Sequence, residues 1–225
     1  MNAGPRFALG IVTRATQNIY DYASYSLFVQ SIYASKNNYA LFPLYPDDMS
    51  TPDYQYHRKL VPLLNTMNSS NLGFHFDFLV WMDADVIPLD LGLRLESIAS
   101  KHPKAHVLMS ADVSSIANTG VILVRNTLWT KKFLTRWLTE KSVASTDQQG
   151  LQQLLQKMVG NEKDREKVIF LPPSVLNSEA PPMGRQLKEH KILHLAAEST
   201  GKSMSFLAAM YRLPPRSVFD LSSMI

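Results

Sequence analysis

The sequence contains no cysteine, which excludes disulfide bonds, thiolate metal ligands and thiol nucleophiles. It has no apolar run of the ~18 residues that a membrane-spanning helix needs, and residues 1–10 lack the pattern of a signal peptide. Excess charge is also small, because 23 basic and 19 acidic side chains leave a net charge of +4. This excess suits anionic ligands but is too small to indicate a nucleic-acid surface. We therefore expect a chain that is soluble as given, without a membrane span and without a nucleic-acid partner.

The chain has enough apolar material for a substantial core, since 45% of its 225 residues are hydrophobic. Short apolar runs alternate with segments of helical periodicity, which predicts an α/β fold with a mostly parallel central sheet flanked by helices. The expected strands are 7–13, 39–45, 76–82, 106–110, 120–124, 168–171 and 191–195. The expected helices are 21–36, 54–67, 89–101, 127–141, 147–158 and 203–212. No composition shift marks a boundary, so residues 1–225 are expected to form a single domain.

The strongest chemical signal is a pair of aspartates at the end of the most hydrophobic run. Residues 76–82 stop abruptly at Asp83 and Asp85, which lie two apart before Pro88. Extended backbone would send both carboxylates to the same side, where they would repel each other unless a cation lay near them. Ligands of open α/β sheets bind at this edge, outside the carboxyl ends of the strands. The pair therefore predicts a divalent-metal site, although two acidic residues can also serve only to cap a strand and form a turn.

Several segments in a collinear order resemble a known family. They are the opening strand into Thr13, residues 31–39, Lys59 within 57–62, 80–85, 118–126 with Trp129, 147–148 and 194–198. Together they cover about residues 6–206 and are similar to nucleotide-sugar glycosyltransferases of the GT-A fold. The resemblance is greatest to glycosyltransferase family 34, the galactosyl-, xylosyl- and mannosyltransferase group.

The resemblance implies a GT-A catalytic domain that transfers a sugar from a UDP- or GDP-sugar donor to a hydroxyl acceptor on a glycan or glycoprotein. It implies retention of configuration at the sugar carbon and a Mn²⁺ cofactor, with Mg²⁺ as the alternative. Asp83, Asp85 and His194 match the metal ligands of similar enzymes. Asp147 and Gln148 resemble the catalytic region beside the reacting sugar carbon.

Further site residues follow from the same matches. The implied donor and nucleotide contacts, beside the two aspartates, are Thr13, Arg14, Lys59, Ala84 and Lys202. Tyr20 lies near the loop after the first strand, where its ring is a candidate to stack on the base. The segment implied to line the donor sugar or the acceptor is Asn118, Thr119 and Gly120.

Two features depart from the family pattern. Similar enzymes often have a glycine where this chain has Ala197. The membrane anchor and stem of the Golgi members are also absent. We therefore expect either a soluble relative, which would be cytoplasmic, or the luminal catalytic fragment of a Golgi membrane protein.

Other functions are compatible with parts of the sequence. Residues 196–203 satisfy a relaxed phosphate-binding loop pattern, but Ala196 replaces its first glycine and too few residues follow to complete an NTPase sheet. A dehalogenase-type phosphatase would use Asp83 as its nucleophile, but such enzymes carry Thr or Val where this chain has Ile87. A nucleotidyltransferase would usually have a glycine-rich loop after the first strand, and residues 13–17 contain no glycine. A sugar-nucleotide-binding protein with a degenerate site is a further alternative.

Overall fold

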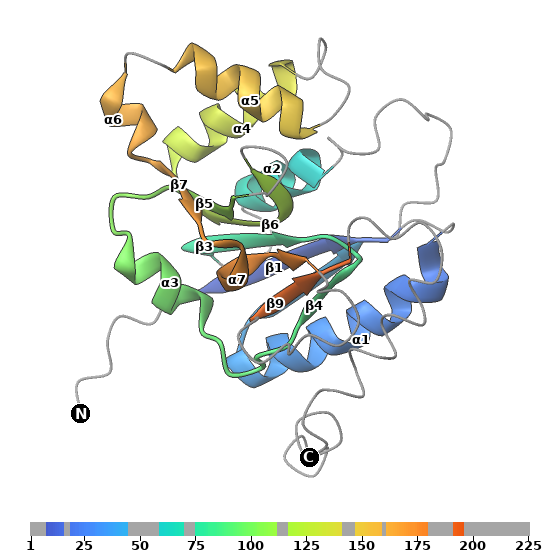
Figure 1. The fold of residues 1–225 in the computed structure, drawn as a ribbon. Helices are drawn as coiled ribbons and strands as arrows, with labels where there is room; N and C mark the ends of the chain where they lie inside the picture. Colours follow the sequence, from blue (N-terminus) through green and yellow to red (C-terminus); the bar gives the residue numbers. More distant parts are fainter. Residues whose placement is uncertain are drawn as a thin grey trace, which may run out of the picture.

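The fold is built on a six-stranded sheet in the order β2-β1-β3-β6-β5-β7 (Figure 1). The computed structural model describes residues 8–15, 19–44, 59–69, 75–111, 117–140, 147–158, 161–179 and 191–195. The strands are β1 Leu9–Arg14, β2 Ala40–Leu44, β3 Phe78–Met82, β5 Val107–Ser110, β6 Asn118–Arg125 and β7 Val168–Leu171. Neighbours pair in parallel except at β6, which is antiparallel to both β3 and β5. The predicted α/β class with a mostly parallel sheet is confirmed.

Strand β3 divides the core into two halves because successive side chains of a strand point to opposite faces. Phe78 and Val80 belong to the cluster on one face, and Leu79 and Trp81 belong to the cluster on the other. Figure 1 shows α1 on the first side of the sheet and α2, α4 and α5 on the second. These helices are α1 Tyr20–Asn37, α2 Leu60–Asn68, α4 Leu128–Glu140 and α5 Asp147–Lys157. The continuous apolar run of β3 is thus explained by burial on both faces.

A second, three-stranded sheet adjoins the carboxyl end of β3. Its order is β4-β9-β8, where β4 is Val86–Pro88, β9 is Ile192–His194 and β8 is Ser178–Glu179. Strand β9 is antiparallel to β4 and parallel to β8. This sheet brings the late part of the chain beside the residues that follow β3. The remaining short helices are α3 Leu95–Lys101, α6 Glu162–Arg165 and α7 Pro173–Leu176.

One predicted helix is wrong in its first half. The expected helix over 89–101 begins only at Leu95, because the main-chain N–H groups of Leu89 and Asp90 both donate to Lys191 O at 2.9 and 3.0 Å. The Asp90 carboxylate then accepts the N–H of Gly92 and stabilises a turn. Pairing with distant Lys191 therefore overrides the helical pattern of the sequence.

The other predicted elements agree with the structure within a few residues wherever it describes them. The predicted positions that lie outside the described residues are 7 and 45 in the first two strands, 54–58 and 141 in the helices over 54–67 and 127–141, and the whole helix over 203–212. No helix in the described part of the chain is long and apolar enough to cross a membrane.

The two-sided burial of β3 predicts a large stability loss on truncation there. Leu79 is fully buried, so Leu79→Ala should lower the free energy of unfolding by about 2–5 kcal/mol through lost burial and a residual cavity. Val61→Ala, on the exposed surface of α2, should change it by about 0.5 kcal/mol or less. Urea denaturation of both variants tests this, and equal losses would contradict the described core.

Candidate functional site

The two aspartates lie in a tight turn that begins where β3 ends. The N–H of Asp83 donates to Gly120 O of β6 at 2.8 Å, and the N–H of Val86 donates back to Asp83 O at 3.1 Å. Residues 83–86 therefore form a β-turn with carboxylates at its first and third positions. We expected the two side chains to converge along extended backbone, and the structure instead brings them together across this turn.

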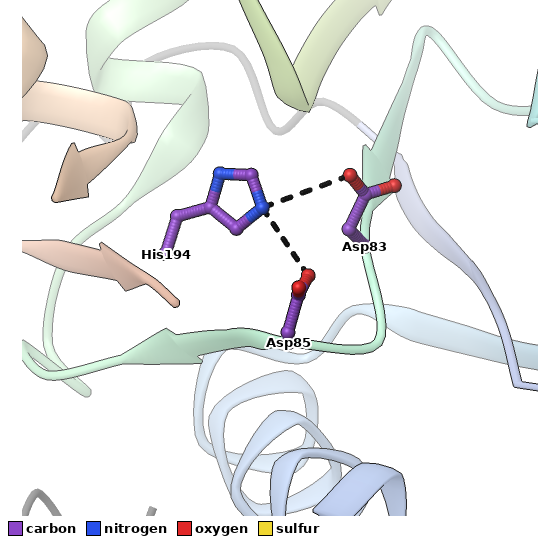
Figure 2. A group of neighbouring side chains, drawn as sticks. All are labelled: Asp83, Asp85 and His194. Atoms are coloured by element: carbon purple, nitrogen blue, oxygen red, sulfur yellow. Dashed lines mark ion pairs between the residues drawn. The ribbon is translucent and has the colours of Figure 1, made fainter. Parts of the chain in front are cut away.

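His194 faces both carboxylates from strand β9 (Figure 2). Its position is fixed by the pairing of His194 with Val86 and by the N–H of Leu195, which donates to Asp85 O at 3.0 Å. The Nε2 atom of His194 lies 3.2 Å from Asp85 Oδ1 and 3.8 Å from Asp83 Oδ2. One ligand atom from each of the three residues lies within 4.8 Å of the others, so the group could hold a metal ion.

Gly120 leaves the space that the imidazole of His194 occupies. A Cβ atom added at Gly120 would lie 2.4 Å from Cε1, 2.5 Å from Nδ1 and 2.9 Å from Nε2 of His194. Any side chain at this position would therefore displace the ring. The Nδ1 atom of His194 is buried and has no hydrogen-bond partner among the residues described, so packing against Gly120 and the strand pairing orient the ring.

Asp83 is held by a buried lysine and by a tryptophan of its own strand. The Nζ atom of Lys59, which is 7% exposed just before α2, lies 3.2 Å from the carboxylate and donates to Thr119 O at 3.0 Å. Trp81 Nε1 donates to Asp83 Oδ1 at 2.5 Å. Burial raises the pKa of Asp83 above its usual value, while Lys59 opposes the rise.

Two residues that bear on the carboxylates, Trp81 and Tyr22, were not predicted from the sequence. Trp81 could have been predicted, because its place two residues before Asp83 puts both side chains on one side of the chain. Tyr22 lies on α1, and its pKa rises to about 12 through burial and then through the charge of Asp85. No sequence signal separates Tyr22 from the other tyrosines of that helix.

The expected nucleoside edge lies next to the turn. Strand β1 pairs with β3 as far as Val12, which lies opposite Trp81. Thr13 and Arg14 therefore lie at the carboxyl end of β1, next to the end of β3 where Asp83 follows. The Thr13 side chain is buried, and its Oγ1 accepts or donates no hydrogen bond within the described part of the chain. The Thr13 hydroxyl is therefore enclosed at this end of β1.

Tyr20 and Ala84 occupy different environments. Tyr20 is 41% exposed at the start of α1, where a ring could contact a ligand. Ala84 is buried and packs with Ala15 and Ala23, which explains why a small residue separates the two aspartates. The turn can approach α1 closely only because these side chains are small.

The remaining predicted residues divide into those that the structure places and those that it does not. Asn118 Oδ1 accepts the N–H of Gly120 at 3.0 Å, and Thr119 contacts Lys59, so this segment supports the site from β6. Asp147 and Gln148 begin α5, but their side chains lie outside the described structure. Lys202 also lies outside the described residues.

Comparisons with known proteins give a family match and a fold. A model of the galactosyl transferase GMA12/MNN10 family, glycosyltransferase family 34, matches residues 97–197. The matched region includes the 118–120 segment, α5 and His194, and begins after the two aspartates. A crystal structure of a glycosyltransferase involved in glycosylation of the major capsid of the virus PBCV-1 superposes with a TM-score of 0.68 at 14% identity. This likeness covers 88% of this chain and 99% of the viral protein. The chain has the GT-A fold and is similar to family 34.

Two further structures share the fold with this GT-A protein. The apo form of the glycosyltransferase GlyE of Streptococcus pneumoniae TIGR4 gives a TM-score of 0.57 at 11% identity, covering 96% of this chain and 64% of GlyE. The bifunctional WbbM gives 0.58 at 13% identity, covering 95% of this chain and 51% of WbbM. No curated protein matches the chain by sequence. The family match and the fold support glycosyltransferase activity, and the GT-A fold disfavours the NTPase and phosphatase alternatives.

The close packing at Gly120 predicts a local loss of cation binding. Gly120→Ala should displace the His194 ring and weaken Mn²⁺ binding at least tenfold while leaving most of the fold intact. Gly92→Ala is the matched control, since its added Cβ would meet only Asp90 Oδ1, at 3.5 Å. Calorimetric titration with MnCl₂ compares the two, and wild-type affinity in Gly120→Ala would refute the orientation described here.

The raised pKa of Asp83 predicts how stability depends on pH. A carboxyl with a higher pKa in the folded than in the unfolded chain binds a proton more tightly when folded, so stability rises as the pH falls through the folded pKa. The stability of the wild type relative to Asp83→Asn should therefore increase on acidification from neutral pH towards the unfolded value of about 3.9. Urea denaturation in EDTA at several pH values measures this difference. A constant or decreasing difference would show that the pKa is not raised.

Proposed function

We propose that this protein is a metal-dependent glycosyltransferase that moves a sugar from a nucleoside-diphosphate donor to a hydroxyl group of a glycan or glycoprotein. The observation that carries this proposal is the convergence of Asp83, Asp85 and His194 at the carboxyl end of the central strand. Parallel strands of α/β sheets present their carboxyl ends to ligands, and the family resemblance gives the reaction class. The donor base is uracil or guanine, and transfer proceeds with retention.

The residues present fit a divalent cation. Two carboxylates and one imidazole form a ligand set for a hard to borderline cation, so Mn²⁺ is the expected ion and Mg²⁺ the alternative. The Nε2 atom of His194 already points at both carboxylates, as a ligand atom must (Figure 2). When bound, such a cation acts as a Lewis acid that stabilises the negative charge on the departing diphosphate.

Lys59 would stabilise the same negative charge on the departing diphosphate. Its buried amino group opposes the rise in the pKa of Asp83 that burial causes, and it also adds a positive charge beside the site. A positive group that is already in place needs no reorganisation when the sugar–phosphate bond breaks and negative charge develops. The Lys59 contacts to Thr119 hold that group still.

The other predicted residues have proposed roles around the donor. Thr13 and Arg14 would bind the nucleoside, while Tyr20 would stack on its base. Ala84 would lie against the nucleotide, and Lys202 would bind the diphosphate. The sugar or the acceptor would meet Asn118, Thr119 and Gly120. Asp147 and Gln148 would stabilise the oxocarbenium-like sugar carbon, since a retaining reaction of this kind needs no base there to activate the acceptor.

The proposal predicts a nucleotide response that depends on the metal. A ligand that binds only the folded state raises its stability, so UDP or GDP should raise the melting temperature when Mn²⁺ is present and not in EDTA. Asp85→Asn should abolish both this shift and sugar transfer. Asp77→Asn is the matched control, because Asp77 lies at the opposite end of β3 and contacts the N–H of Ala8.

Thermal-shift titrations with UDP, GDP and ATP, followed by assays with UDP- and GDP-sugars, carry out this test. A Mn²⁺-dependent shift with one diphosphate identifies the donor base. A shift without sugar transfer would favour a binding protein with a degenerate site. A shift with ATP alone, or full transfer in EDTA, would contradict the proposal.

A further inference from the structure

The turn that carries the two aspartates is held from α1 by a buried glutamine. Gln30 Nε2 lies 3.2 Å from Asp83 O and 3.0 Å from Val86 O, which are the carbonyls at the two ends of the turn. Ser26, one helical turn earlier, donates from Oγ to Val86 O at 2.6 Å and lies 3.0 Å from Gln30 Nε2. Both side chains are fully buried.

Main-chain hydrogen bonds also hold the turn, in addition to these side-chain contacts. The main chain of β6 accepts the N–H of Asp83 through Gly120, and the main chain after β9 donates to Asp85 O through Leu195. Strands β6 and β9 thus fix the turn by pairing. Gln30 and Ser26 of α1 hold the turn from another direction, through side-chain hydrogen bonds to its carbonyls.

Such burial of polar groups calls for an explanation. An amide in an apolar layer is destabilising unless its hydrogen bonds are made, and an apolar side chain would pack on the sheet without that requirement. Here the Gln30 amide donates towards the two carbonyls at the ends of the turn and towards Ser26 Oγ. Its Oε1 is buried with no hydrogen-bond partner in the described structure, so the amide is positioned for its donors alone.

We propose that Gln30, supported by Ser26, is a positioning residue for the cation site. It acts through the main chain of residues 83–86 and sets where the carboxylates of Asp83 and Asp85 point. This inference rests on the proposed metal-dependent function, because it assigns the buried amide to the geometry of the ligands. Groups that orient metal ligands are typically worth 10- to 100-fold in metal affinity.

Asn37 offers a matched comparison on the same helix. Its buried Nδ2 donates to Leu91 O at 2.9 Å and to Tyr33 O at 2.9 Å, so it also anchors a distant carbonyl to α1. Leu91 lies in the connection between β4 and α3, which contains none of the three proposed metal ligands. Loss of this amide should therefore cost stability without changing the cation site.

The experiment compares Gln30→Met with Asn37→Leu. Both variants should unfold at lower urea concentrations than the wild type, because each loses buried hydrogen bonds. Only Gln30→Met should bind Mn²⁺ more weakly, by about tenfold or more, in calorimetric titrations of folded protein without any nucleotide. Ser26→Ala removes the donor to Val86 O and one acceptor of the Gln30 amide but keeps that amide. It should therefore give a smaller loss of affinity with a fold that is easier to retain.

The outcomes separate this proposal from the one on which it rests. Wild-type Mn²⁺ affinity in folded Gln30→Met, or in Ser26→Ala if Gln30→Met does not fold, would overturn the positioning role and leave the metal site standing. Equal losses of affinity in Gln30→Met and Asn37→Leu would also overturn it, because general destabilisation would then explain both. A wild-type protein that binds no Mn²⁺ would instead contradict the proposed function itself.

Discussion

The repulsion between two neighbouring carboxylates is the constraint on which the rest of the site depends. Asp83 and Asp85 both face His194, and the pKa of Asp83 is raised by burial and also by the charge of Asp85. Like charges at this separation are stable only if positive charge or hydrogen-bond donors surround them. Lys59 and Trp81 supply part of that compensation, as a positive charge and a hydrogen-bond donor at Asp83. A divalent cation would complete it, which is why the arrangement favours a metal.

The fold satisfies this constraint by bringing distant segments to one edge of the sheet. Strand β3 ends at the turn, and antiparallel β6 begins beside it, so Gly120 lies opposite Asp83. Strand β9 then delivers His194 from near the end of the described chain. The absence of a side chain at Gly120 allows the imidazole to occupy the remaining space. The turn after β3 contributes two carboxylates and β9 contributes the imidazole, so no element forms the site alone.

Helix α1 belongs to the site as much as to the core. Its apolar residues, such as Val29 and Tyr33, cover one face of the sheet. Its buried polar residues, Ser26 and Gln30, reach the carbonyls of the turn instead. The same helix therefore stabilises the sheet by burial of apolar surface and fixes the carboxylates by hydrogen bonds. In this protein, stability and the geometry of the proposed metal site are coupled through one element.

The sequence by itself determined the alternation of strands and helices, the two-sided burial of β3 and the position of Asp83 and Asp85 at its end. These follow from periodicity and from the abrupt change of an apolar run to charge, which are local properties. Family resemblance added His194 as a partner. Tertiary structure alone decided that Leu89 pairs with Lys191 instead of continuing a helix, and that Gln30 reaches the turn of Asp83 and Asp85. Those features depend on contacts between residues far apart in the chain, and no local pattern encodes which distant carbonyl a buried side chain will meet.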